Sequence, residues 1–138
     1  MDTQGITQRT DKQITQAAID DLAAIPGELA DAERELANIG LDIKGARMDL
    51  QDAEIEAQIN CAADGKNAEA RKLQMDKAVR ESEQVKAFRE KLTGLENMQI
   101  GAEVRFNDLH RRWKSALAVA ELQASKIRYL ATFERPAK

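Results

Sequence analysis

Aromatic residues, cysteine, histidine and proline are all scarce in this chain. Aromatics make up 4% of its 138 residues, and it has two prolines, one cysteine and one histidine. A lone cysteine excludes an internal disulfide and is typical of a reducing compartment. Because no apolar run approaches a membrane span and no secretory signal pattern opens the sequence, we expect a cytoplasmic protein that does not contact a membrane.

The residues that carry enzyme chemistry are also few. The only histidine, His110, cannot build a histidine metal cluster and is interpreted as a surface residue. Gly65-Lys66 lacks the flanking residues of a phosphate-binding loop. The many carboxylates are expected on exposed helix flanks, with no pocket to perturb them. We therefore expect no enzyme, no catalytic residues, no metal and no cofactor.

A heptad repeat occupies the first half of the chain. Every seventh residue from Asp21 to Glu56 is acidic, and the next residue is apolar. This first apolar row is Leu22, Leu29, Leu36, Ile43, Leu50 and Ala57. A second row follows three residues later, at Ile25, Ala32, Ile39, Ala46 and Ala53. Two apolar rows with one charged flank are typical of a helical zipper.

A second heptad repeat, from Val85 to Leu130, has a flank that is mostly basic. Its two heptad rows are apolar except at Gln99 and Gln123. They are Val85, Leu92, Gln99, Phe106, Trp113, Ala120 and Ile127, and Phe88, Leu95, Ala102, Leu109, Ala116, Gln123 and Leu130. Residues 62–67 between the repeats contain Gly65, which suits a helix end, and Asn67, which suits a helix start. The chain is therefore predicted to reverse at this turn.

Reversal at residues 64–67 brings the acidic flank beside the basic one. The predicted ion pairs are Glu56–Lys77, Asp42–Lys91, Glu28–Arg105 and Asp21–Arg112. The same register stacks Ile43 on Phe88, Ile39 on Leu92 and Leu29 on Ala102. Since each exposed pair contributes only about 0–1 kcal/mol, the charges select the register and apolar burial provides the stability.

The predicted fold is all-α: a long antiparallel coiled-coil helical hairpin with a short N-terminal helix, oligomerising through its C-terminal end. Residues 11–133 form one hairpin domain, between a flexible N-terminus (1–10) and a C-terminal tail (134–138). Its helices are expected at about 11–24, 26–62 and 68–133, because Pro26-Gly27 interrupts the first arm. Gly94 and Gly101 are positions where the second arm could bend.

The second arm is longer than the first, so pairing is expected to end near residue 121. Residues 122–133 then overhang, with apolar residues on more than one face. Monomers rarely expose such a patch. We therefore predict self-association, or binding of a protein partner, through Leu122, Ile127, Tyr129, Leu130 and Phe133; the alternative is that the N-terminal segment folds over them.

Charge is distributed unevenly along the chain. Residues 1–64 hold five basic and 14 acidic side chains (net −9), and residues 65–138 hold 16 basic and ten acidic (net +6). Pairing of the two flanks explains much of this gradient. Arg111, Lys114 and Arg128 lie near one face of the second arm; they either track nucleic-acid phosphates or form an ordinary solvated face.

Residues 65–72, Gly-Lys-Asn-Ala-Glu-Ala-Arg-Lys, resemble a Gly-Lys-Asn-x-Glu-x-Arg-Lys segment in small helical proteins of tailed phages. Arg111-Arg112-Trp113 matches a cluster in their second helix. The plan of residues 28–130 is similar to that of UvsY-type recombination mediators. That resemblance implies an oligomer that binds single-stranded DNA and works with a recombinase or single-strand binding protein, in the host cell cytoplasm. The contacts it implies are Arg71, Lys72, Arg111, Lys114, Lys126 and Arg128.

Three functions stay open on this evidence. The first is a phage accessory protein that binds single-stranded DNA in recombination or replication. The second is a protein-binding adaptor or counter-defence inhibitor acting through the acidic helix, which requires that helix's charges to be free. The third is a structural or assembly coiled coil, which requires only the zipper and the overhang.

Overall fold

The computed structural model of this chain describes residues 10–134. Three helices account for most of them: α1 spans Asp11–Asn60, α2 spans Ala68–Glu81 and α3 spans Glu83–Glu134. Residues 10–134 contain no strand, which confirms the all-α class. The expected flexible N-terminus (1–10) and C-terminal tail (134–138) lie almost wholly outside the described residues.

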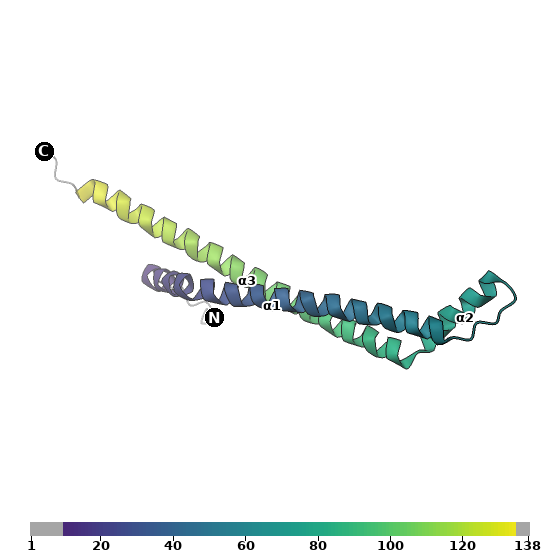
Figure 1. Ribbon diagram of the computed structural model, residues 1–138. Helices are drawn as coiled ribbons and strands as arrows, with labels where there is room; N and C mark the ends of the chain where they lie inside the picture. Colours follow the sequence, from purple (N-terminus) through teal and green to yellow (C-terminus); the bar gives the residue numbers. More distant parts are fainter. Residues whose placement is uncertain (1–9, 135–138) are drawn as a thin grey trace, which may run out of the picture. The chain divides into compact units, whose positions relative to one another are not determined.

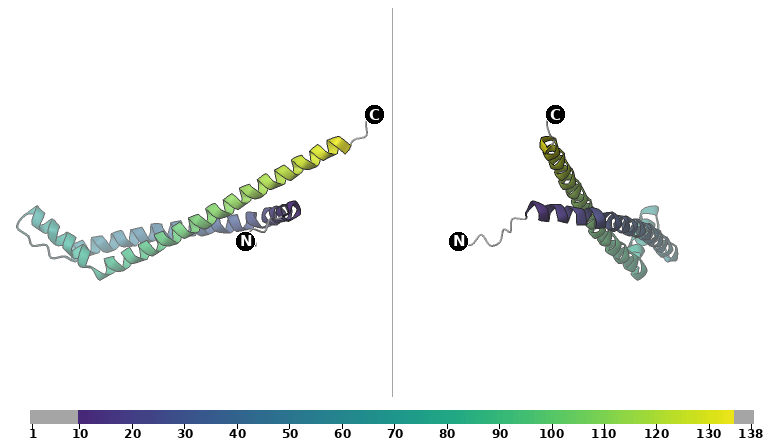
Figure 2. Two further views of the ribbon diagram at one scale, coloured as in Figure 1. Left: turned by 180° about the vertical axis from the view of Figure 1, so that it is seen from behind. Right: turned by 90° about the vertical axis from the view of Figure 1, so that its left-hand side faces the viewer.

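Contacts divide the chain into two units. The inner unit comprises residues 34–103, and the terminal unit comprises residues 10–33 and 104–134 of the described chain. Within the inner unit, the last part of α1 lies beside the first part of α3 (Figure 1). The loop after α1 and helix α2 lie together at one end of this unit, as both views in Figure 2 show.

The predicted apolar rows are the buried rows. In α1, every residue of the second row is buried, and every residue of the first row is buried or half-buried. In α3, both rows are buried or half-buried from Val85 through Gln123, and they become exposed at Ile127 and Leu130. The heptad prediction is therefore confirmed for α1 and for α3 as far as Gln123.

One predicted apolar contact of the inner unit differs from the contacts observed. The predicted register places Ala102 beside Leu29, but Ala102 packs in a cluster with Ile39 and Ile43. Leu36, Leu92 and Leu95 pack against this cluster. Ile39 and Leu92, which were predicted to stack, belong to the same cluster.

The second flank of the zipper carries two ion pairs that were not predicted. Arg47 Nη2 lies 3.9 Å from Glu96 Oε1, and Arg89 Nη2 lies 3.3 Å from Glu54 Oε1. Both pairs join α1 to α3 within the inner unit, and each exposed pair of this kind contributes about 0–1 kcal/mol.

The predicted break at Pro26 is also wrong. α1 continues as one helix from Asp11 to Asn60 with Pro26 inside it. Proline in a helix interior costs about 3 kcal/mol relative to alanine. However, Ile25 is 0% exposed and Ala32 is buried on the other side of the proline. Burial of the apolar row on both sides of Pro26 offsets that cost and keeps the helix continuous.

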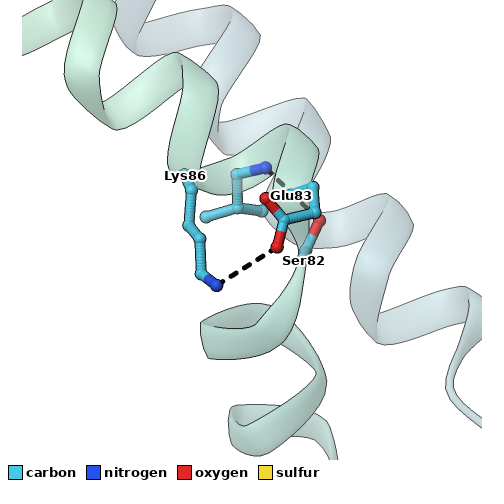
Figure 3. Close-up of polar contacts among 4 residues, drawn as sticks. Ser82, Glu83 and Lys86 are labelled. Atoms are coloured by element: carbon cyan, nitrogen blue, oxygen red, sulfur yellow. Dashed lines mark hydrogen bonds and ion pairs between the residues drawn. The ribbon is translucent and has the colours of Figure 1, made fainter.

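The second arm is broken at Ser82, where one helix from 68 to 133 was expected. The Ser82 N–H donates to Ala78 O and Val79 O and closes α2. Its Oγ accepts a hydrogen bond from Val85 N at 3.3 Å and caps α3. Glu83, in the first turn of α3, pairs with Lys86 at 3.3 Å (Figure 3). A serine followed by an acidic residue is a helix start signal, and it outweighs the continuous pattern.

The side chain of Gln74 holds the loop between α1 and α2 through two hydrogen bonds. Its Oε1 accepts from Gly65 N at 3.1 Å, and its Nε2 donates to Asp64 Oδ1 at 2.9 Å. A Cβ at Gly65 would lie 2.7 Å from the Cβ of Ala70, so only glycine fits this close approach. As predicted, Asn67 caps α2: its Oδ1 accepts from Ala70 N at 2.8 Å.

The Asn67 cap gives a first testable prediction. Asn67→Ala removes the acceptor of the Ala70 N–H and should lower the stability of α2 by about 1 kcal/mol. Amide hydrogen exchange of Ala70 reports this loss as faster exchange. Asn97→Ala, an exposed change within α3, is the control and should leave exchange at Ala70 unchanged; equal exchange in both variants would contradict the capping role.

Candidate interaction surfaces

The end of α3 presents large apolar side chains to solvent. The exposed fractions are 55% for Leu122, 66% for Ile127, 64% for Tyr129, 58% for Leu130 and 70% for Phe133. The rings of Tyr129 and Phe133 are in edge contact, with centroids 4.8 Å apart. All five residues predicted to mediate self-association are thus exposed in the single chain.

Four of the predicted DNA-contacting residues also belong to the terminal unit. Arg111 pairs with Asp108 one turn earlier, and Lys126 Nζ lies 3.5 Å from Asp11 Oδ2. Lys126, which was expected to lie beyond the paired region, is therefore held to the first residue of α1. Among the side chains that the structure describes, no ion pair involves Lys114 or Arg128, and both are exposed.

Arg71 and Lys72 belong to the inner unit. Both are exposed in the first turns of α2, and Arg71 Nη1 donates to Gly65 O at 3.5 Å. The six predicted DNA contacts are therefore divided between the two units. They do not form one established surface, and the four on α3 are accompanied by Glu121, which lies seven residues after Lys114.

One predicted pairing of the flanks is confirmed and another is not. Arg112 Nη2 lies 2.8 Å from Asp21 Oδ1, as predicted. Lys77 pairs with Glu81 within α2, at 3.9 Å, and not with Glu56, because α2 is separated from the zipper. Asp42 and Lys91 line the same open groove of about 370 Å³, together with Leu41, Asp49 and Leu95.

A larger groove of about 540 Å³ lies where α1, α2 and α3 meet in the inner unit. Glu54, Asp76, Arg80 and Arg89 line it, and Glu54 and Arg89 form an ion pair with each other. No cluster of histidine, cysteine or carboxylate side chains in residues 10–134 is arranged to hold a metal ion. None of the three helices is both long and apolar enough to cross a bilayer.

His110 lies on the surface, as predicted, and Cys61 follows the last residue of α1. His110 is exposed, and its ring stacks on Phe106 with centroids 6.2 Å apart. Cys61 is half-buried at the end of α1, and its Sγ contacts Gln74 O at 3.6 Å. These contacts give each residue a structural role in its own unit.

Comparisons with known proteins add no assignment. No protein-family model, no curated protein and no solved structure matches this chain. Interpretation of the surfaces therefore rests on their own residues, and the resemblance to recombination mediators stays a hypothesis.

An exposed apolar row on the outer side of α1 was not predicted from the sequence. Leu41, Met48, Ile55 and Ile59 are exposed by 67%, 59%, 44% and 75%. The signal was present, since Leu41, Met48 and Ile55 recur every seven residues. It was masked by the stronger buried rows of the same helix.

Proposed function

We propose that this protein is a non-catalytic assembly module, a helical hairpin that binds further copies of itself through the end of α3. The observation that carries the proposal is the exposed apolar cluster of Leu122, Ile127, Tyr129, Leu130 and Phe133, defined here as the α3 end cluster. Monomeric proteins rarely expose a contiguous apolar patch unless it binds a partner.

An antiparallel coiled coil within the inner unit is the first part of the proposal. Between the ion pairs Arg47–Glu96 and Glu54–Arg89, the residue number rises along α1 as it falls along α3. The buried rows follow heptad spacing in both helices. These contacts support two helices of opposite direction that bury their apolar rows against each other.

Continuation of the apolar rows past the paired region is the second part. Asp11, the first residue of α1, pairs with Lys126, and Gln123 is the last half-buried residue of the α3 rows. Ile127 and Leu130 continue the same rows and are exposed. A row that is apolar but unpaired favours a second helix as its cover.

The assembly proposal predicts a particle larger than one chain. In light scattering coupled to size-exclusion chromatography at micromolar concentration, the mass should be a multiple of 15.4 kDa. A monodisperse species at 15.4 kDa over this range would reject the proposal. A mass that falls on dilution gives the affinity of the contact.

Binding of single-stranded DNA is the second candidate function. The observation that favours it is that Lys114 and Arg128 are exposed, without an ion pair in the described residues, on the same segment as the α3 end cluster. Assembly would bring several copies of this weak basic face around one strand and raise the avidity.

A salt series tests the DNA candidate. Lys114→Glu combined with Arg128→Glu should weaken binding and reduce the slope of log K against log salt by about 1.4, since each neutralised phosphate of a single strand contributes about 0.7. Lys86→Glu, an exposed change on the inner unit, is the control. Equal slopes in both variants would reject these residues, and no binding at low salt would reject the function.

A further inference from the structure

Two exposed rows in this chain have the same spacing. On α1, Met48, Asp52, Ile55 and Ile59 form a row defined here as the α1 outer row. On α3, Leu122, Lys126, Tyr129 and Phe133 form the α3 end row. Each row reads apolar, charged, apolar, apolar at intervals of four, three and four residues. Residues at such intervals lie on one face of a helix.

We propose that the α3 end row of one copy docks on the α1 outer row of a second copy, with the two helices parallel. This inference rests on the assembly proposed above and names the surface that receives the α3 end. Aligned in parallel, the rows give four pairs: Met48–Leu122, Asp52–Lys126, Ile55–Tyr129 and Ile59–Phe133.

Both rows are exposed to solvent, so a second copy can contact them. The apolar members of the α1 outer row are 44–75% exposed, and those of the α3 end row are 55–70% exposed. Each row spans eleven residue steps, or about 17 Å of helix. Apolar burial along this length provides the attraction.

Charge selects this pairing over the alternatives. Pairing two α1 outer rows in parallel would place Asp52 against Asp52, and pairing two α3 end rows would place Lys126 against Lys126. Antiparallel alignment would set each charge against an apolar side chain. Only the parallel match of unlike rows sets Asp52 against Lys126, so it is the arrangement without a like-charge or unpaired polar contact.

Formation of the Asp52–Lys126 pair would break few existing contacts. Asp52 is exposed and takes part in no ion pair among the described side chains. Lys126 would exchange its contact with Asp11, an exposed pair with side chains 49% and 81% accessible. Such exposed pairs contribute little, so the exchange does not oppose docking.

The docking is proposed between copies, and it joins two unlike surfaces, the α3 end row and the α1 outer row. A contact between unlike surfaces of successive copies is heterologous. Contacts of this type close into rings or continue as filaments.

Cross-linking of single-cysteine chains tests the docking. In a Cys61→Ser background, Met48→Cys and Leu122→Cys variants carry tags of different size, are mixed and are treated with a short bis-maleimide. We expect the mixed dimer to form at least roughly tenfold faster than either homodimer. Mixing Leu73→Cys, an exposed α2 variant, with Leu122→Cys is the control and should give background yield.

The outcomes separate this inference from the assembly proposal. Homodimers of Leu122→Cys without the mixed dimer would mean that α3 ends meet each other; assembly would stand and the docking would be overturned. Background yield in all mixtures, with a 15.4 kDa mass, would overturn both. Single charge reversals, Asp52→Lys or Lys126→Asp, should weaken association roughly tenfold, and their combination should restore it. Failure of the combined variant to recover would contradict the Asp52–Lys126 pair.

Discussion

Ile43→Ala is expected to lower the free energy of unfolding by about 2–5 kcal/mol. The Ile43 side chain is 4% exposed and packs with Ile39 and Ala102 in the core cluster of the inner unit. Truncation removes buried methyl groups and leaves a cavity between two long helices that close only partly around it. Because domains are stable by only about 5–15 kcal/mol, a loss of this size is a large part of the total.

Ile100→Ala is the matched control for this prediction. Ile100 is 60% exposed on α3 in the same unit, so its truncation should change stability by about 0.5 kcal/mol or less. Urea titrations at one fixed protein concentration compare the two, since assembly makes stability depend on concentration. Similar midpoints for Ile43→Ala and Ile100→Ala would mean that the described core is not the stabilising one.

Tyr129→Lys combined with Phe133→Lys is expected to dissociate the assembly into chains of 15.4 kDa. Both side chains are exposed in the single chain, at 64% and 70%, so the change costs little within a folded chain. In an assembly, each lysine would bring a charge into an apolar contact, which is costly without a partner. The expected readout is a mass of one chain at concentrations where the wild type is larger.

Leu73→Lys is the matched control for the dissociation. Leu73 is 66% exposed on α2, outside the α3 end cluster, and its change should leave the mass unaltered. Helix content of all variants, from circular dichroism, should equal that of the wild type. An unchanged mass for the Tyr129 and Phe133 variant would show that the α3 end cluster is not the contact.

Heptad spacing made most of the architecture predictable. The buried residues of α1 from Ile25 to Ala53 were identified from their spacing, as was the exposure of Ile127 and Leu130. Burial of apolar side chains makes the largest contribution to stability. Buried apolar residues recur at regular spacing along each helix, so they can be recognised in the sequence. The Asn67 cap was predictable for the same kind of local reason.

The contacts between the two long helices were predictable only in part. The Asp21–Arg112 ion pair was predicted and is observed, whereas Ala102 packs with Ile39 and Ile43 and not with Leu29. The ion pairs Arg47–Glu96 and Glu54–Arg89 lie on the opposite flank, which the prediction did not consider. Each exposed pair is weak, so one charged flank alone does not determine the contacts along the core.

The helix breaks were predicted wrongly at two positions. A break was expected at Pro26 and is absent, and a break at Ser82 was not expected and is present. Proline is a strong helix breaker, yet α1 continues through it because Ile25 and its row are buried. Ser82 is a weak signal inside a long helical pattern, yet it ends α2 and caps α3. Tertiary packing outweighs propensity in the first case, and a satisfied cap provides a stable break in the second.

The candidate surfaces were predictable only in part. The α3 end cluster follows from the unequal lengths of the two arms, so the sequence located it. The α1 outer row did not stand out, because Asp52 interrupts its apolar members. Its significance depends on exposure, which requires knowing which face of α1 packs against α3.

Chemical cross-linking within one chain tests the pairing of α1 with α3 most directly. In an Arg89→Lys variant, a carbodiimide joins an amine to a carboxylate only when the two touch, and Arg89 contacts Glu54 at 3.3 Å. We predict an amide between position 89 and Glu54, found by mass spectrometry within a single chain in mixtures of isotopically light and heavy protein. A link from position 89 to a different carboxylate, or one that joins light to heavy chains, would contradict the hairpin on which the exposed end of α3 depends.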